Sequence, residues 1–100
     1  MYKRQEQIQY FESNGRKITV YCSNESHEFY GKLSDLSEMK ILKNFLMIHK
    51  SFYINIAHIS SYSYDSLTID DCRELPISKP NRKEVRRAIL KYSADRFREE

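Results

Sequence analysis

Several features that mark other classes of protein are scarce or absent in this sequence. No apolar run approaches the roughly 18 residues that a membrane-spanning helix needs. The first ten residues are polar and charged, without the apolar core of a signal peptide. We therefore expect no membrane segment and a cytoplasmic location. With only two glycines and two prolines, the chain also has no low-complexity tract, linker or Gly-rich oxyanion loop.

Cysteine and catalytic patterns are equally sparse. Cys22 and Cys72 are the only cysteines, far apart in sequence and without CxxC spacing. They predict two reduced, half-buried thiols, and no metal or cofactor. Ser51 lies two residues from His49, but no third orienting group accompanies this pair. The carboxylates lack the paired spacing of an acid–base site, so we expect no enzyme.

The composition is that of one globular domain. Apolar residues make up 40% of the 100 residues and charged residues 31%. The sequence predicts a single domain over residues 1–100, with a core from about 8 to 92 and a charged tail at 93–100. The net charge of +3 is unevenly distributed, because residues 79–98 hold eight basic and two acidic residues while residues 65–74 are mainly acidic. This distribution fits a protein that presents one side to a polyanion, and also fits a solvated helix face.

The longest apolar run, Phe45–Ile59, is interrupted by the polar triplet His49-Lys50-Ser51. Three adjacent polar residues are costly to bury, so we expect the chain to reach the surface there between two buried segments. An exposed Lys50 held in this way has no evident structural task and is well placed to contact a partner. We expect that partner to be DNA.

Short strands dominate the predicted elements. Alternation and β-forming residues predict strands over Ile8–Glu12, Lys17–Cys22, His27–Tyr30, Phe45–Ile48, Ile59–Tyr64, Leu67–Ile69 and Cys72–Leu75. Apolar spacing predicts a short helix over Ser34–Lys43 and a C-terminal helix from about Asn81, where Asn81 and Glu84 have capping-box spacing. The segment Phe52–Ile56 fits either a strand or a helical turn. The expected fold is mainly β, of the α+β class, with antiparallel sheets, a short two-turn helix and a C-terminal helix.

The first two strands are predicted to form a hairpin. Asn14-Gly15 is the strongest short hairpin signal, and it lies between these two strands. Arg16 and Lys17 should therefore be exposed at the hairpin tip.

Three segments of the sequence match family motifs in register. They are Ile8-x-Tyr10-Phe11-Glu12-Ser13, Phe45-x-x-Ile48-His49-Lys50-Ser51-Phe52-x-Ile54-Asn55 and Leu75-Pro76-Ile77-Ser78-Lys79. In this order they resemble the signature segments of the LytTR-type DNA-binding domain, and the resemblance runs from about Ile8 to Tyr92. The middle motif is quite specific. The resemblance implies elongated, small antiparallel sheets and an output domain of a bacterial response regulator in a two-component system.

The resemblance also implies a DNA site, because this family reads the major groove with loops. Carried over by position, the contacts are Arg16 and Lys17 at the hairpin tip, Lys50 after the histidine, and Lys79 after the serine of the last strand. Neighbours that could bond to phosphates and fix the register are Asn14, Ser51, Ser78 and Asn81. For His49, a base contact and a packing role that holds the loop are both open.

Two departures from the family pattern affect these expectations. Lys50 and Lys79 stand where arginine is common, and lysine offers a point charge in place of a planar fork, so base discrimination there could be weaker. Only seven residues precede Ile8, where the family normally has a further strand, so we expect a fragment of a longer regulator or a short free-standing form.

The resemblance further implies partners and an oligomeric state. They are promoter DNA with direct repeats, a receiver domain in the full-length protein, and an isolated domain that is monomeric and pairs on DNA. The alternative is a protein- or ligand-binding β module without nucleic acid, motivated by the acidic hairpin at residues 65–74 and by exposed strand edges.

Overall fold

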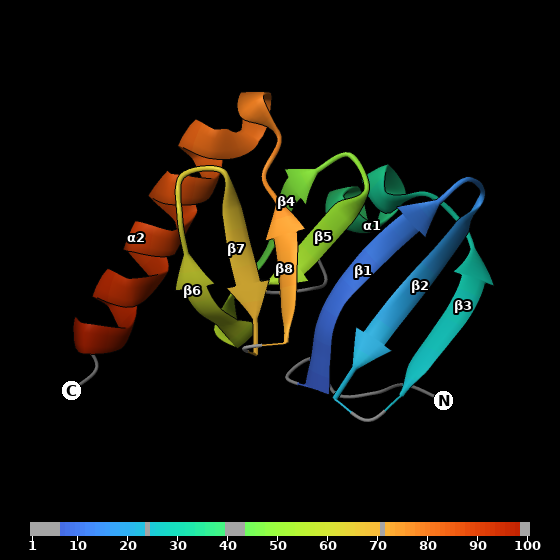
Figure 1. The fold of residues 1–100 in the computed structure, drawn as a ribbon, viewed down its shortest axis with the longest axis horizontal. Coiled ribbons are helices and arrows are strands. Elements are labelled where there is room, and N and C mark those ends of the chain that lie inside the picture. Colours follow the sequence, from blue (N-terminus) through green and yellow to red (C-terminus); the bar gives the residue numbers. More distant parts are fainter. Residues whose placement is uncertain (1–6, 24, 40–43, 71, 99–100) are drawn as a thin grey trace.

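The computed structural model of the protein describes residues 7–23, 25–39, 44–70 and 72–98. Strand is the most frequent secondary structure in this part of the chain, and the strands form two antiparallel sheets accompanied by two α-helices (Figure 1). The strands are β1 (Ile8–Asn14), β2 (Lys17–Cys22), β3 (Ser26–Tyr30), β4 (Phe45–His49), β5 (Phe52–Asn55), β6 (Ile59–Tyr62), β7 (Ser66–Ile69) and β8 (Arg73–Pro76). The helical elements are α1 (Leu33–Met39), the 3₁₀ turns η2 (Ile56–His58) and η3 (Lys79–Asn81), and α2 (Arg82–Arg98). The predicted mainly-β fold is confirmed.

The larger sheet has the strand order β3-β2-β1-β5-β4. It is built from two hairpins, β1–β2 and β4–β5, that are joined where β1 pairs with β5 in antiparallel register, Tyr10 opposite Ile54 and Glu12 opposite Phe52. The smaller sheet, β6-β7-β8, is a meander of consecutive strands. This topology places the β1–β2 and β4–β5 turns at the same end of the larger sheet (Figure 1).

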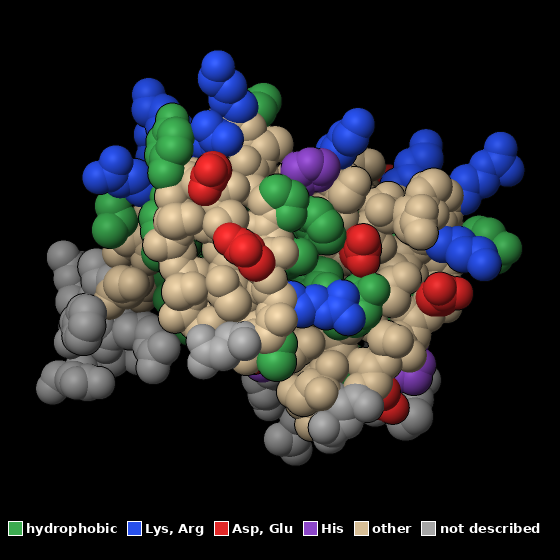
Figure 2. All heavy atoms as spheres, viewed as in Figure 1, with side chains coloured by type: hydrophobic (Ala, Val, Ile, Leu, Met, Phe, Trp, Pro, Cys, Tyr) green, Lys and Arg blue, Asp and Glu red, His purple; other side chains and the backbone are tan. Residues whose placement is uncertain are grey.

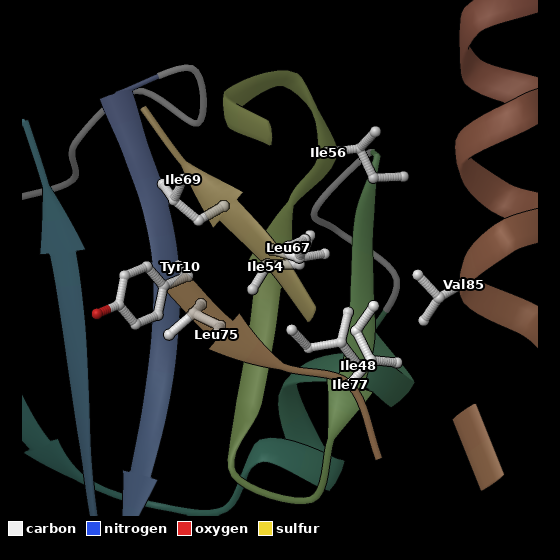
Figure 3. Packing of buried hydrophobic residues seen from close by; sticks show 9 residues of the cluster. All are labelled: Tyr10, Ile48, Ile54, Ile56, Leu67, Ile69, Leu75, Ile77 and Val85. Carbon is white, nitrogen blue, oxygen red and sulfur yellow. The ribbon is translucent and has the colours of Figure 1, made fainter. Parts of the chain in front are cut away.

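The main core lies between the two sheets and α2 (Figure 3). Its buried members are Tyr10, Ile48, Ile54, Ile56, Leu67, Ile69, Leu75, Ile77 and Val85. A second buried cluster lies on the opposite face of the larger sheet and includes Phe11, Ile18, Leu33 and Tyr53. Neighbouring residues such as Tyr10 and Phe11 enter different clusters because successive side chains of a strand point to opposite faces.

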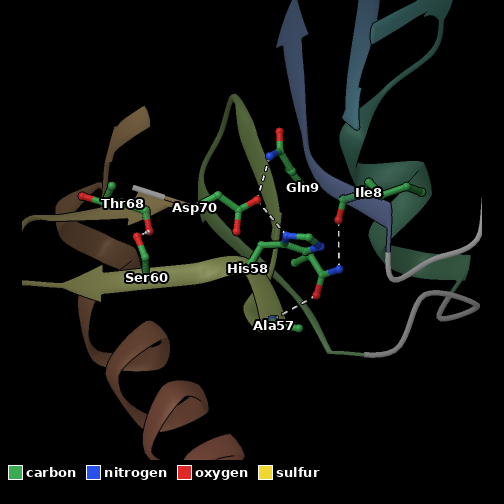
Figure 4. A network of polar contacts seen from close by, with 8 residues as sticks. Ile8, Gln9, Ala57, His58, Ser60, Thr68 and Asp70 are labelled. Carbon is green, nitrogen blue, oxygen red and sulfur yellow. Dashed lines mark hydrogen bonds and ion pairs between the residues drawn. The ribbon is translucent and has the colours of Figure 1, made fainter. Parts of the chain in front are cut away.

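Polar contacts also connect the two sheets (Figure 4). The Asp70 carboxylate accepts a hydrogen bond of 2.7 Å from Gln9 Nε2 of β1, and it lies 2.8 Å from His58 Nδ1 at the end of η2. Asp70 follows β7 and has a positive φ of 50°, a conformation that aspartate tolerates in turns. The acidic hairpin between β7 and β8 is therefore anchored to the N-terminal strand.

Several predicted boundaries differ from those observed. The segment Phe52–Ile56, which fitted either a strand or a helical turn, forms strand β5 and then enters η2. Asn55 caps this turn by accepting a hydrogen bond from Ala57 N. Helix α1 begins at Leu33 and not after a Ser34 cap, while its predicted continuation over 40–43 lies outside the described residues. Strand β6 ends at Tyr62, two residues earlier than predicted. The apolar face of α2 is confirmed, with Val85 fully buried.

Candidate nucleic-acid interface

The first cationic loop is the turn of the β1–β2 hairpin. Asn14 pairs with Lys17, which leaves Gly15 and Arg16 as a two-residue turn, with Gly15 at a φ of 66°. The backbone carbonyl of Arg16 accepts a hydrogen bond of 3.0 Å from Gly31 N, so the residue that follows β3 stabilises the turn. All four residues from Asn14 to Lys17 are exposed, which confirms the predicted exposure of Arg16 and Lys17.

The two cations of this hairpin differ in their surroundings. Lys17 Nζ lies 3.9 Å from Glu28 Oε1 and 5.7 Å from the centre of the Tyr30 ring, both on β3. Within the described ranges, Arg16 forms no ion pair with a carboxylate. Arg16 is therefore the cation of this hairpin that is less engaged with the protein itself.

The second loop is the β4–β5 turn, formed by Lys50 and Ser51. Ser51 N donates a hydrogen bond of 3.1 Å to His49 Nδ1, and the His49 ring packs 5.5 Å from that of Phe52. His49 thus holds the turn, which was one of its two predicted roles, and its Nε2 is the nitrogen left for any outward contact. Lys50 is exposed at the apex, and the part of the chain that the structure describes places no carboxylate in an ion pair with it.

The third loop is the segment from Ser78 through η3, which runs beside the edge strand β4. Ser78 N donates a hydrogen bond of 2.9 Å to Ile48 O, and Asn81 Nδ2 donates one of 3.2 Å to Met47 O. The Ser78 hydroxyl donates to Asn81 Oδ1. Asn81 therefore fastens the loop to β4, and these side-chain contacts differ from those of the predicted capping box. Lys79 is exposed between these anchors.

Backbone hydrogen bonds join these three loops into one row. Ser13 N at the end of β1 donates to Ser51 O over 2.8 Å, which ties the first loop to the second. The bond from Ser78 N to Ile48 O ties the second to the third. The three loops lie along the upper edge of Figure 1, and Figure 2 shows Lys and Arg side chains projecting along that edge. The acidic side chains visible in Figure 2 lie mainly on the broad face below it.

The predicted site residues separate into two groups by exposure. The cations Arg16, Lys17, Lys50 and Lys79 are exposed together with Asn14, whereas the half-buried residues are His49, Ser51, Ser78 and Asn81. The second group supplies most of the hydrogen bonds that shape the loops. The fold thus presents positive charge on a polar scaffold that is already ordered.

Comparison with known proteins supports the predicted resemblance. The sequence model of the LytTr DNA-binding domain family matches residues 3–90. This chain belongs to that family. A LytTr DNA-binding domain from Bacillus cereus, described as part of a methyl-accepting/DNA response regulator, has the same fold, with a TM-score of 0.77. That alignment covers 89% of this chain and 86% of the other at 18% identity. No curated protein matches this LytTr domain in sequence.

The structure also describes the side chains that could bind metal ions, and the two thiols, of this LytTr domain. Among the residues that the structure describes, no group of three or more His, Cys, Asp or Glu side chains could hold a metal ion. Cys22 is buried and Cys72 exposed, both as free thiols, where the sequence predicted two half-buried ones. No described helix is long and apolar enough to cross a membrane.

One arrangement in the LytTr domain was not anticipated from the sequence. The Arg82 guanidinium carbon lies 4.8 Å from the centre of the Tyr64 ring, at the junction of η3 with α2. The basic composition of residues 79–98 pointed to cations in this region. Nothing in the sequence indicated that an aromatic ring from the β6–β7 turn would pack against one of them.

Proposed function

We propose that this LytTr domain binds double-stranded DNA in a sequence-specific manner by inserting its three cationic loops into the major groove. The observation that carries the proposal is the row of backbone-linked loops, each with an exposed cation. DNA presents a regular array of phosphates, and its major groove carries the base-edge pattern that allows discrimination. A fixed row of cations on a rigid edge matches such a target better than it matches a small ligand.

The dimensions of the domain are compatible with this proposal. The molecule extends 37 Å along its longest axis, which runs parallel to the row of loops (Figure 1). One turn of B-DNA spans about 34 Å, so loops at the two ends of the row could reach successive major grooves on one side of a duplex.

The residues of the site would make different kinds of contact with DNA. Arg16 offers a planar fork suited to guanine O6 and N7, whereas Lys50 and Lys79 offer point charges to base or phosphate. Lys17 lies close to the Glu28 carboxylate, so it would contribute to the positive electrostatic potential of the edge more than to a specific contact with DNA. Phosphate contacts that fix the register could come from Asn14, Ser51, Ser78, Asn81 and the Nε2 of His49.

The family and the proposed DNA binding together suggest a biological setting for this domain. We infer that the domain is the output part of a bacterial two-component response regulator, joined to a receiver domain in the full-length protein. The isolated domain would be monomeric and would pair on direct repeats in promoter DNA. Such a regulator acts in the cytoplasm, where chromosomal DNA is found.

Lys50 gives the sharpest test of this function. A binding site is first selected from random duplexes and then titrated at several salt concentrations with wild-type protein and Lys50→Ala. We expect Lys50→Ala to weaken binding to the selected site by about tenfold more than binding to random duplex, because a base contact carries sequence information and a phosphate contact does not. Lys91→Ala, an exposed cation on α2, is the matched control and should change both affinities little.

Two results would contradict the proposal in different ways. Equal losses of affinity on selected and random DNA would assign Lys50 to the phosphate backbone. Unchanged migration of every duplex at low salt would instead favour a protein-binding β module. The observation behind that alternative is β3, an edge strand with all five residues exposed, including Phe29 and Tyr30.

A further inference from the structure

Arg82 at the start of α2 is held in place by two contacts from different elements. Its guanidinium carbon lies 4.8 Å from the centre of the Tyr64 ring, and its Nε donates to Ile77 O over 3.4 Å. Tyr64 itself is 69% exposed, in the turn between β6 and β7. Arg82 is half-buried, so part of its side chain remains accessible to solvent.

This arginine lies at the end of the row of loops. Arg82 follows directly after η3, and the β6–β7 turn lies beside the start of α2 along the upper edge of Figure 1. Figure 2 shows several Lys and Arg side chains gathered around a hydrophobic side chain at that end of the edge. Arg86, one helical turn after Arg82, is exposed and lines a shallow groove together with Tyr64.

The chemistry of this end favours an anionic ligand with fixed geometry. A stacked guanidinium group has lost much of its rotamer freedom before binding, so a bidentate contact with phosphate oxygens costs less entropy. Asp65, the acidic residue that directly follows Tyr64, accepts a hydrogen bond of 3.5 Å from Ser63 Oγ. Within the described part of the chain it forms no ion pair with Arg82 or Arg86, so the two cations are not neutralised by it.

We propose that Arg82, oriented by Tyr64, binds the phosphate backbone of DNA together with Arg86, as a fourth contact beyond the three loops. This inference rests on the proposed DNA binding and extends its footprint past Lys79 to the β6–β7 turn. The contact carries no base information and instead fixes the position of the duplex at one end of the row.

The test measures the dependence of DNA affinity on salt. At moderate salt, Arg82→Ala and Arg86→Ala should each bind about tenfold more weakly, to selected and random duplexes alike. The slope of log K against log salt should fall by about 0.9 for each phosphate contact removed. Lys91→Ala, on the opposite side of α2 from Arg82, is the matched control and should retain the wild-type slope.

Variants of Tyr64 test whether the ring acts through Arg82. Tyr64→Phe keeps the aromatic face and should bind DNA as wild type does, whereas Tyr64→Ala should weaken binding. The double variant Tyr64→Ala/Arg82→Ala should bind no more weakly than Arg82→Ala alone, because the ring has no effect once the guanidinium group is gone. Thermal unfolding of each variant shows whether it is folded, and Arg86→Ala gives a test that leaves the Tyr64 contact intact.

The outcomes separate this inference from the proposed function. If wild type and Lys91→Ala bind DNA while Arg82→Ala and Arg86→Ala keep the wild-type affinity and slope, the fourth contact is wrong and the loop contacts stand. That result would assign the Tyr64 groove to another ligand class, such as an acidic protein segment. If no duplex binds wild type at low salt, both proposals fall.

Discussion

Individual buried polar residues determine how well the loops of this LytTr domain are held. Asn55 is 4% exposed, and its side chain satisfies two backbone groups from different elements. Its Nδ2 donates to Ile8 O over 2.9 Å, and its Oδ1 accepts from Ala57 N over 3.0 Å. Asn55 therefore links the end of the β4–β5 hairpin to the start of β1.

Replacing Asn55 should have a large effect on stability. Asn55→Ala leaves the buried carbonyl of Ile8 and the part-buried N–H of Ala57 without this partner, and we expect the free energy of unfolding to fall by about 3 kcal/mol. Urea denaturation followed by circular dichroism measures the change. The control is Asn14→Ala at an exposed position, where the expected loss is below about 0.5 kcal/mol. Equal losses for the two variants would show that the Asn55 hydrogen bonds do not stabilise the fold.

Buried tyrosines should make the domain sensitive to alkaline pH. Burial raises the pKa of Tyr53 above its usual 10.0, and burial is also the largest cause of the raised pKa values of Tyr10 and Tyr21. Above pH 10 the unfolded chain loses these protons before the folded protein does. The unfolded state then binds fewer protons, so the free energy of unfolding falls as pH rises.

Urea midpoints measured between pH 8 and pH 11 would test this pH dependence. The wild type should lose stability above about pH 10, and Tyr53→Phe should lose it less steeply because one shifted group is gone. Tyr30→Phe, at a position that is 76% exposed, is the control. Identical pH profiles for Tyr53→Phe and wild type would contradict the assigned cause.

At the scale of elements, the β1–β2 turn depends on one glycine. Gly15 has a φ of 66°, and a Cβ atom built there would meet nothing within 4 Å. The cost of a side chain at this position is therefore conformational and not steric. A glycine of positive φ in the first position of a two-residue turn also matches the twist of the flanking strands.

Substitutions at Gly15 should follow this conformational cost. Gly15→Ala should destabilise the protein by about 1 kcal/mol, whereas Gly15→Asn should cost less because asparagine tolerates a positive φ. Chemical denaturation of the two variants gives the comparison. Greater stability for the alanine variant than for the asparagine variant would argue against a positive φ at this turn.

Elements with local signals could be predicted from the sequence, and long-range contacts could not. Alternation and the Asn14-Gly15 pair are local, and they correctly indicated the first hairpin and its exposed cations. The two-residue turn itself is Gly15-Arg16, one residue later than the predicted pair, because Asn14 still pairs with Lys17. The spacing of Asn81 and Glu84 is also local, but it led to a predicted cap that differs from the observed contacts. The Asn81 Oδ1 accepts from the Ser78 hydroxyl, and its Nδ2 donates to Met47 O of β4, which the fold brings near. The stacking of Arg82 on Tyr64 depends on packing in the same way.

At the scale of the whole molecule, Arg73 connects the two sheets. From β8, its Nη1 donates to the Tyr10 hydroxyl over 3.0 Å, and its guanidinium carbon lies 4.7 Å from the centre of the Tyr21 ring. The Tyr10 and Tyr21 rings stack at 4.6 Å, and Tyr21 donates to Glu12 Oε1. A charge-assisted hydrogen bond and a cation–π contact therefore help to fix the smaller sheet against the larger.

Removing this connection should loosen the pairing of the sheets. Arg73→Ala should lower the melting temperature by roughly 5 °C, which corresponds to about 1 kcal/mol in a domain of this size. Hydrogen exchange of the β6–β8 amides should accelerate more than that of β1 and β2. Arg87→Ala, an exposed cation on α2, is the control for loss of charge, and an equal effect in that variant would contradict the linking role of Arg73.

The links from Ser13 to Ser51 and from Ser78 to Ile48 run between backbone atoms, so exchange of side chains leaves the separation of the three loops largely unchanged. In the proposed complex, an operator whose groove spacing does not match the three loops therefore has to deform in order to bind. Operators with easily deformed pyrimidine–purine steps between the contacted positions should then be preferred, including at base pairs that no side chain touches.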